Sequence, residues 1–356
     1  MPGEFITLSR QDERCREYLL GRIEPQIQAL PVKSFAVDSS REKVTFQVLP
    51  MNQLLRPPLW VVLAQAFRLN ELNLTWAPLA VVAAWLWAQG TDFSGLVLAL
   101  ALLALSGVQG GIFLLNDFYD HMRGLDRLSS RRGSQVIQRG WLRAWQARLW
   151  AWGMLGLGGS LGLLALGLAS PPGGFLPLAL LVSFALIAGL ILAWAPRRLR
   201  RWALPDLFIF LSLGPALTLG LALLLGGEGG QEVLALGAVF GLLALLSFHL
   251  RGLESLKAEH SWLGRLGFDR SHRLLLWALR LFPLLSFALL WFWGTPLWAW
   301  GASPLLALGC WGLLLPDLQV GRSPWSSSLR QLGAKTLALH GALGAWLMIL
   351  SLYGFR

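Results

Sequence analysis

The chain has 356 residues, of which 55% are hydrophobic and only 14% are charged, and its formal net charge is +11. Its repeated uncharged runs of about twenty residues are typical of membrane spans, so the composition argues against a soluble protein. Residues 1–50 contain seven Lys or Arg and seven Asp or Glu, so the positive excess lies in the apolar remainder. There it clusters in short loops, as membrane topology requires, and nucleic-acid binding is not expected.

Residues 1–50 are polar, mixed in charge and without periodicity, and they lack the apolar segment of a signal peptide. We therefore expect a poorly ordered N-terminal extension over 1–50, followed by a membrane-embedded domain over 51–356. Met51 opens a segment that itself resembles a start, so an over-extended reading frame is a second hypothesis for residues 1–50. The two cysteines, Cys15 and Cys310, have no spacing that would indicate a disulfide or a zinc site.

Nine apolar segments predict transmembrane helices. The expected fold class is all-α: a polytopic membrane protein of about nine transmembrane helices around a central, cytoplasm-facing cavity. Ahead of the first span, residues 60–70 have apolar residues at helical spacing and are expected to lie along the membrane interface. Gly214-Pro215 and Pro283 are expected to kink the fifth and seventh spans. The predicted spans are 71–89, 95–116, 149–169, 174–195, 206–226, 231–250, 274–294, 296–316 and 335–354.

Basic residues alternate strictly between the predicted loops. The loops after the second, fourth, sixth and eighth spans are rich in Arg and Lys, whereas those after the first, third, fifth and seventh contain neither. By the positive-inside rule, the N-terminus and the basic loops are expected to be cytoplasmic, in a multi-pass protein of the cell's inner (cytoplasmic) membrane.

Two carboxylates three residues apart, Asp117 and Asp120, project from one helical face where the long apolar second span ends, and the Asn116 amide precedes them. A carboxylate pair at a membrane surface is costly unless a cation, usually a metal ion, binds it. Magnesium typically takes one or two protein carboxylates together with substrate phosphates and water. We therefore predict that Asp117 and Asp120 bind Mg²⁺ and an anionic substrate.

Arginines surround this segment, and the arginine fork suits phosphate oxygens. For most of these arginines, membrane topology alone is a sufficient explanation. The candidate diphosphate-binding residues are Asn116, Arg123, Arg132 and Arg198.

The string NDFYDHMRGLDR at 116–127, followed by GSQVIQRG at 133–140, resembles the UbiA-type intramembrane aromatic prenyltransferases. It is most similar to the branch that prenylates 1,4-dihydroxy-2-naphthoate in menaquinone synthesis. A second stretch, RRLRRWALPDLFIFLSLGPALTLG at 197–220, is also similar to a family segment. The resemblance covers about residues 55–354 in the number and order of the spans.

The resemblance implies an activity. Asp117 and Asp120 would be the catalytic acidic residues, holding Mg²⁺ against the diphosphate of a polyprenyl diphosphate. The metal ion and arginines would neutralise charge on the leaving group as the allylic C–O bond breaks, and an aromatic acceptor would attack the resulting cation. The implied partners are thus a polyprenyl diphosphate, an aromatic acceptor and the lipid bilayer.

The chain departs from the family pattern after the sixth span. Where the family has two aspartates four residues apart for a second magnesium ion, this chain has Gly252 and Leu256, and His249 stands where an Asn is common. Glu254 is the candidate replacement metal ligand. Either one metal ion suffices, or nearby glutamates substitute, or the chain is a catalytically degenerate relative that binds isoprenoids or partners. A transporter is a further alternative, since nine spans with kinked helices permit one.

Overall fold

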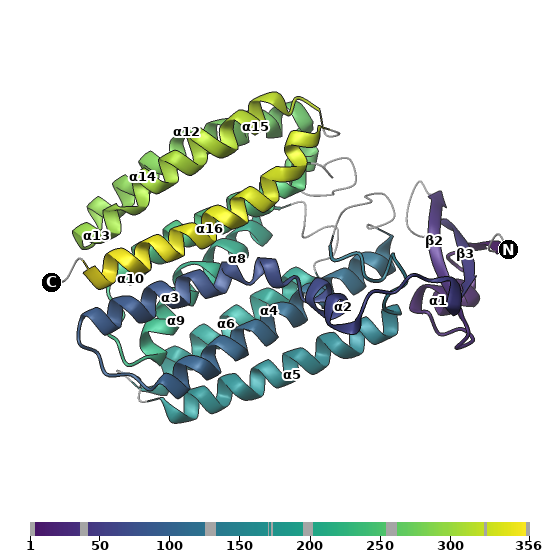
Figure 1. Ribbon diagram of the computed structural model, residues 1–356, viewed down its shortest axis with the longest axis horizontal. Helices are drawn as coiled ribbons and strands as arrows, with labels where there is room; N and C mark the ends of the chain where they lie inside the picture. Colours follow the sequence, from purple (N-terminus) through teal and green to yellow (C-terminus); the bar gives the residue numbers. More distant parts are fainter. Residues whose placement is uncertain are drawn as a thin grey trace. The chain divides into compact units, whose positions relative to one another are not determined.

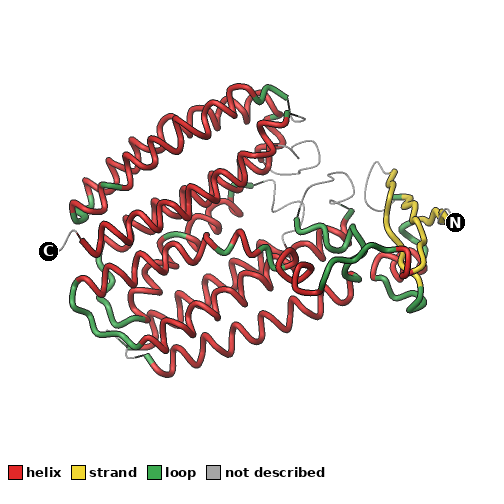
Figure 2. Tube along the Cα trace, viewed as in Figure 1, coloured by secondary structure: helices red, strands yellow, loops and turns green. Residues whose placement is uncertain are grey.

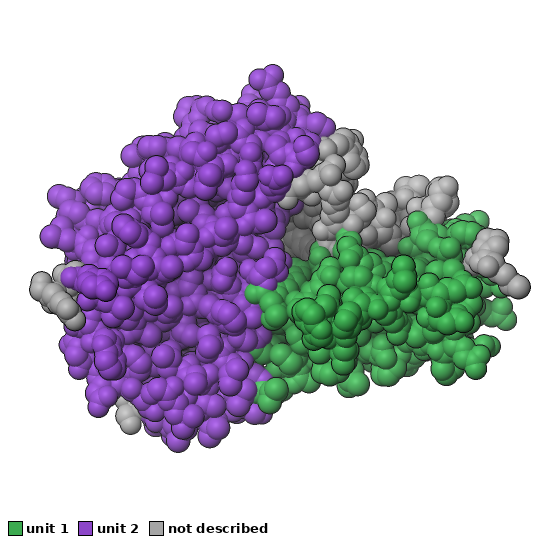
Figure 3. All heavy atoms as spheres, in the orientation of Figure 1, with its two compact units in different colours: residues 1–69, 107–157 green, residues 70–106, 158–356 purple. Residues whose placement is uncertain are grey.

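The computed structural model is built almost entirely of helices, with one small sheet near the N-terminus (Figures 1 and 2). The chain divides into two compact units (Figure 3). Unit 1 comprises Met1–Leu69 and Gly107–Leu157, and unit 2 comprises Asn70–Ser106 and Gly158–Arg356. The structure describes residues 4–35, 42–124, 133–169, 171, 174–194, 202–253, 262–323 and 326–353.

Helices lie at all nine predicted spans in the described part of the chain, which confirms the helical, polytopic fold class. Among the described residues, eight helical segments are long and apolar enough to cross a membrane, whereas α3 (Asn73–Ala88), at the first predicted span, has 16 residues. The predicted central cavity stays a prediction. The eight segments are α4 (Gly95–Arg123), α5 (Ala144–Leu168), α6 (Phe175–Trp194), Leu204–Leu224, α10 (Gln231–Gly252), α12 (Phe268–Phe292), Leu297–Val320 and α16 (Ser327–Tyr353).

Several predicted spans are not single, uninterrupted α-helices. The fifth span breaks at Gly214 into α8 (Leu204–Leu213) and α9 (Pro215–Leu224), as the Gly-Pro pair predicts. By contrast, α12 continues through Pro283 as one helix. The predicted interfacial segment overlaps the short helix α2 (Leu59–Ala66). The segment Leu297–Val320 consists of α13 (Leu297–Trp300), α14 (Ala302–Ala307), a π-helical stretch (Leu308–Leu314) and α15 (Leu315–Val320).

Large apolar side chains remain exposed along the outer helices. Leu163 on α5, Leu176 on α6 and Leu284 on α12 each expose more than half of their surface. A soluble protein seldom exposes so many large apolar groups, because each one costs free energy in water. Lipid tails are a suitable surrounding for them, in agreement with the membrane assignment.

Close contact between helices organises unit 2 around α10, which is its most buried span. A Cβ on Gly237 of α10 would collide with Thr218 and Pro215 of α9, so these helices approach closely only because that position is glycine. The Thr218 hydroxyl donates to the carbonyl of Val233 over 3.0 Å and strengthens the contact. Small residues therefore take the place of the hydrophobic effect, which does not drive helix association in lipid.

Unit 1 contains an N-terminal module of strand, helix and two strands. It consists of β1 (Glu4–Ser9), α1 (Glu13–Leu20), β2 (Ile27–Phe35) and β3 (Lys43–Pro50). Both β1 and β2 pair antiparallel with the central strand β3 (Figure 1). The expectation of a poorly ordered extension is therefore wrong for residues 4–35 and 42–50.

The module is ordered because it has a small hydrophobic core. The sequence pattern of that core is hidden among charged residues. Val44 and Phe46 alternate along β3 and are fully buried, and they pack against Cys15 and Leu19 of α1. This period-2 pattern is short, and equal numbers of acids and bases on the other positions mask it in the composition. Cys15 and Cys310 are both buried.

The N-terminal module is fixed to the C-terminal end of α4 and to the segment that precedes α5. Met122 of α4 packs against the module's core, and the His121 ring donates from Nε2 to the Leu19 carbonyl over 3.1 Å. The Arg10 guanidinium donates to the Met122 carbonyl and pairs with Glu42 at 2.7 Å. These contacts tie residues 4–50 to the helix end that carries the predicted site.

Arg143 makes the densest of these attachments. Its guanidinium donates to five backbone carbonyls in the turn between α1 and β2, at 3.0–3.4 Å. The five acceptors are the carbonyls of Gly21, Ile23, Glu24, Pro25 and Ile27.

Replacement of Arg143 by Met is expected to loosen the N-terminal module. The substitution leaves several carbonyls without their donor, at about 1–3 kcal/mol for each one that stays buried. Hydrogen exchange of the backbone amides of residues 21–27 should therefore accelerate by about tenfold or more. Arg139→Met is the matched control, because Arg139 stacks on the Trp141 ring and should leave this turn unchanged. Equal exchange in the two variants would contradict the assignment.

Candidate functional site

The three predicted residues on α4 lie together, and both carboxylates are buried. Asp117 exposes 3% of its surface and Asp120 exposes 6%. The Asn116 amide nitrogen donates to Oδ2 of Asp120 over 3.2 Å, one helical turn later. The predicted helical face is thus present, and it carries two carboxylates that need compensating charge or hydrogen bonds.

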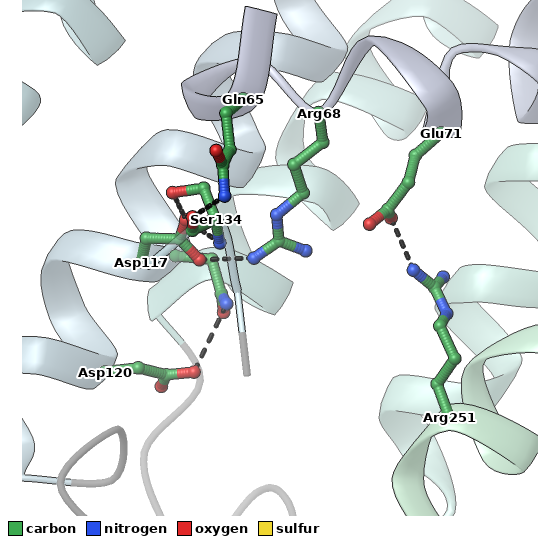
Figure 4. Close-up of polar contacts among 8 residues, drawn as sticks. Gln65, Arg68, Glu71, Asp117, Asp120, Ser134 and Arg251 are labelled. Carbon is green, nitrogen blue, oxygen red and sulfur yellow. Dashed lines mark hydrogen bonds and ion pairs between the residues drawn. The ribbon is translucent and has the colours of Figure 1, made fainter. Parts of the chain in front are cut away.

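Asp117 receives that compensation from both sides. The Arg68 guanidinium forms an ion pair with Oδ1 of Asp117, as Figure 4 shows. On the other oxygen, Oδ2, the backbone N–H of Ser134 donates over 2.9 Å and the Ser134 hydroxyl over 2.6 Å. A buried carboxylate with a charged partner and two further donors is well satisfied.

The loop that supplies Ser134 is shaped for this contact. Gly133 and Gln135 on either side of it have φ of +68° and +58°, a left-handed conformation that suits glycine and is uncommon for glutamine. A Cβ on Gly133 would collide with Asp117 and Arg68. The Gln65 amide of α2 donates to the Ser134 carbonyl over 3.0 Å and holds the loop from the other side (Figure 4).

The other predicted site residues are only partly described. Arg123 lies at the end of α4, and its guanidinium stacks on the Tyr119 ring at 5.4 Å from the centroid. Arg132, Arg198 and Glu254 lie outside the described residues, so their predicted roles stay predictions.

Arg68, Ser134 and Gln65 were not predicted from the sequence. A signal for Arg68 was present, because it is the only Lys or Arg between Arg56 and Arg123. A lone cation within such a long apolar stretch calls for an anionic partner. Ser134 lies inside the string GSQVIQRG but carries no distinguishing feature of its own, and neither does Gln65. Only the fold brings these three side chains to Asp117.

In unit 2, the end of α10 contains two polar contacts near the position of the missing aspartates. The His249 ring nitrogen Nε2 lies 3.1 Å from Oδ2 of Asp206, which also accepts from the indole N–H of Trp262, the first residue of α11 (Trp262–Leu266). Arg251 forms an ion pair with Glu71 at 2.7 Å (Figure 4). Gly252, which ends α10, offers no side chain for a metal ion.

The donor set of the α4 site fits a divalent cation that prefers oxygen. Asp117, Asp120 and the Asn116 amide offer oxygen atoms of the kind that Mg²⁺ prefers, and Mg²⁺ would complete its coordination with water and substrate phosphates. Within the described ranges there is no group of three or more His, Cys, Asp or Glu side chains that could hold a metal ion. The protein alone would thus supply few ligands, and an anionic substrate would supply the rest.

Comparison with solved structures identifies the same fold in UbiA homologues from Archaeoglobus fulgidus. The structure bound to GPP and Mg²⁺ matches with a TM-score of 0.58 and 18% identity. The structure bound to DMAPP and Mg²⁺ matches with a TM-score of 0.54 at the same identity, and the one bound to Cd²⁺ with 0.53 and 16%. Each match covers at least 80% of this chain and 99% of the other chain. By sequence, no family profile and no curated protein matches the chain.

Replacement of Gly133 by Ala is expected to destabilise the loop around Ser134. A left-handed conformation costs an L-residue about 1–2 kcal/mol, and the new methyl group would also displace Asp117 or Arg68. The thermal unfolding midpoint of the purified protein should fall. Gly153→Ala is the matched control, because nothing lies within 4 Å of a Cβ at that helical position. An equal midpoint in the two variants would contradict the assigned role of Gly133.

A double-mutant cycle should show that the Arg251–Glu71 pair stabilises unit 2. Glu71 is buried, so Glu71→Gln or Arg251→Met alone should cost about 2–4 kcal/mol, somewhat below fully buried pairs because Arg251 is a quarter exposed. The double variant should cost less than the sum. The more exposed Lys335–Asp317 pair is the control, and Asp317→Asn should cost less than about 1 kcal/mol. Additive effects at Glu71 and Arg251 would rule out the coupling.

Proposed function

We propose that this protein is a magnesium-dependent, membrane-embedded prenyltransferase that moves a polyprenyl group from its diphosphate to an aromatic acceptor. The observation that carries the proposal is the buried Asp117 and Asp120 pair at the end of an apolar span. The fold supports it, because similar structures were solved with the prenyl diphosphates DMAPP and GPP together with Mg²⁺.

In this proposal, Asp117 and Asp120 would hold the metal ion, and the Asn116 amide orients Asp120 through its hydrogen bond. Bound Mg²⁺ would supply positive charge to the diphosphate leaving group. The allylic C–O bond breaks and its electron pair stays on the diphosphate. A ring carbon of the acceptor forms the new C–C bond and then loses its proton, or its carboxylate as CO₂, which restores the aromatic ring. Arg123, Arg132 and Arg198 are the proposed additional contacts of the diphosphate.

For the acceptor we propose 1,4-dihydroxy-2-naphthoate, and so a role in menaquinone synthesis. The support is the string NDFYDHMRGLDR with the following GSQVIQRG. We also propose that the N-terminus and the Asp117 end of α4 face the cytoplasm, on the inner membrane, because the basic loops alternate with uncharged ones.

A second candidate is a relative that binds prenyl diphosphates without transferring them. The observation in its favour is the glycine at 252, where the resemblance leads one to expect an aspartate. In addition, His249 is paired with Asp206 and Arg251 with Glu71. These contacts give the polar residues at the end of α10 a structural role. Glu254 is the proposed remaining ligand for a second metal ion.

An assay of prenyl transfer tests the proposal directly. Purified protein in lipid nanodiscs receives Mg²⁺, a radiolabelled polyprenyl diphosphate and 1,4-dihydroxy-2-naphthoate, and labelled product is measured by extraction. Asp117→Asn and Asp120→Asn should each lower the rate by about 100-fold or more, since both remove charge that holds the metal ion. Chelation of Mg²⁺ by EDTA should abolish the reaction, and added Mg²⁺ should restore it.

Asp317→Asn is the control for this assay, because that carboxylate pairs with Lys335 on another helix and has no assigned role in the reaction. Saturable binding of the prenyl diphosphate without product from naphthoate, hydroxybenzoate or homogentisate acceptors would favour the second candidate. Product formation that is insensitive to both α4 substitutions would refute the assigned site.

A further inference from the structure

We propose that Arg68 is a resident counter-ion of Asp117, and that a divalent metal ion binds this site only by displacing the Arg68 guanidinium. The inference rests on the proposed function, because it concerns the same carboxylate. It adds a competition between a protein cation and the metal ion. This competition can be measured without turnover.

Protein donors engage both oxygens of Asp117. Oδ1 accepts from Arg68, and Oδ2 accepts both from the backbone N–H and from the hydroxyl of Ser134. A carboxylate has about four lone-pair positions, so protein donors take three of them. A metal ion on Oδ1 would therefore lie directly beside the guanidinium.

The ion pair is largely shielded from water. Asp117 is buried and Arg68 is mostly buried, with 4% and 13% of their side-chain surface exposed. Two cations that share one buried carboxylate oxygen repel each other strongly, because water does not screen them. The guanidinium and a divalent ion are thus alternatives at Oδ1, whereas the neutral donors of Ser134 at Oδ2 are compatible with either one.

The backbone of Arg68 is strained. It has φ of +49°, a conformation that residues with a large side chain seldom adopt. Such strain persists only where the surroundings enforce it, and it gathers at sites that change state. The guanidinium also lies 5.0 Å from the centroid of the Phe113 ring. The face of this ring can still attract the guanidinium after it has left Asp117.

A consequence follows for substrate binding. A displaced Arg68 keeps its positive charge and needs another anion, and the diphosphate that the proposed reaction brings is such an anion. The metal ion and diphosphate should therefore bind with positive coupling, each one weakly alone and more tightly together. Arg68 would prevent a stable metal-bound state without substrate.

Binding of Mn²⁺ to the purified full chain tests this competition. The fraction of free Mn²⁺ is measured by its spin-resonance signal, with and without inorganic pyrophosphate. In Arg68→Met, the affinity for Mn²⁺ alone should rise by about tenfold or more, because one neighbouring cation changes the proton affinity of a carboxylate by roughly 10- to 1,000-fold. The gain from added pyrophosphate should shrink in this variant.

Arg148→Met is the matched control, since it removes the same charge from a guanidinium that stacks on Phe118 of α4. It should leave the Mn²⁺ affinity within about twofold of the wild-type value, because Arg148 does not compete for Oδ1 of Asp117. The double variant Arg68→Met with Asp117→Asn should lose the gain, since the contested carboxylate is absent.

A second measurement uses the unmodified protein, so that it stands even if Arg68→Met does not fold. Phenylglyoxal labels accessible guanidinium groups, and mass spectrometry identifies the labelled arginine. Mn²⁺ should increase the labelling of Arg68 and leave that of Arg143 unchanged. Equal labelling of Arg68 with and without bound Mn²⁺, or an Mn²⁺ affinity unchanged or lowered in Arg68→Met, would overturn the proposal.

The two proposals fail in distinguishable ways. Tight Mn²⁺ binding that is independent of Arg68 would reject the competition and leave the proposed metal site intact. Absence of Mn²⁺ binding in every variant, even with pyrophosphate, would reject both the metal site and the competition. Absence of prenyl transfer together with the expected Mn²⁺ results would reject only the proposed activity.

Discussion

The compensation of one buried charge, that of Asp117, determines the arrangement of unit 1. A carboxylate with 3% exposure is tolerable only if charge and hydrogen bonds replace its water. Arg68 reaches it from the segment after α2, and Ser134 reaches it from the loop before α5. Three separate stretches of the chain therefore converge on one side chain. Two residues in the left-handed conformation, Gly133 and Gln135, flank Ser134 where it reaches this acid.

Much of the membrane architecture could be predicted from the sequence, because each span must satisfy its own backbone hydrogen bonds and so appears as a continuous apolar run. The Gly214-Pro215 break was predictable for a related reason, since proline at that position removes a backbone donor. The pairing of Asp117 and Asp120 on one face required only helical periodicity. These features depend on residues that are near one another in the chain.

What could not be predicted depends on contacts between distant residues. The sheet of residues 4–50 has few apolar positions, and their alternation is meaningful only after three strands pair. The partners of Asp117 lie 49 and 17 residues away from it, and neither separation follows from any local pattern. Gly133 has a function only because Asp117 and Arg68 occupy the space that its Cβ would take. Local rules identified the acid but not the groups that neutralise it.

The attachment of the N-terminal module through Arg143 also restricts how the chain threads the bilayer. The guanidinium bonds to carbonyls 116–122 residues earlier, so the beginning of the chain and the start of α5 must share one side of the membrane. The number of crossings between them is then even. Because α4 crosses once, α3 must cross as well, although its 16 residues are fewer than a full hydrocarbon thickness usually requires. We therefore expect that the bilayer is thinner beside α3, or that the ends of α3 lie within the headgroup layer.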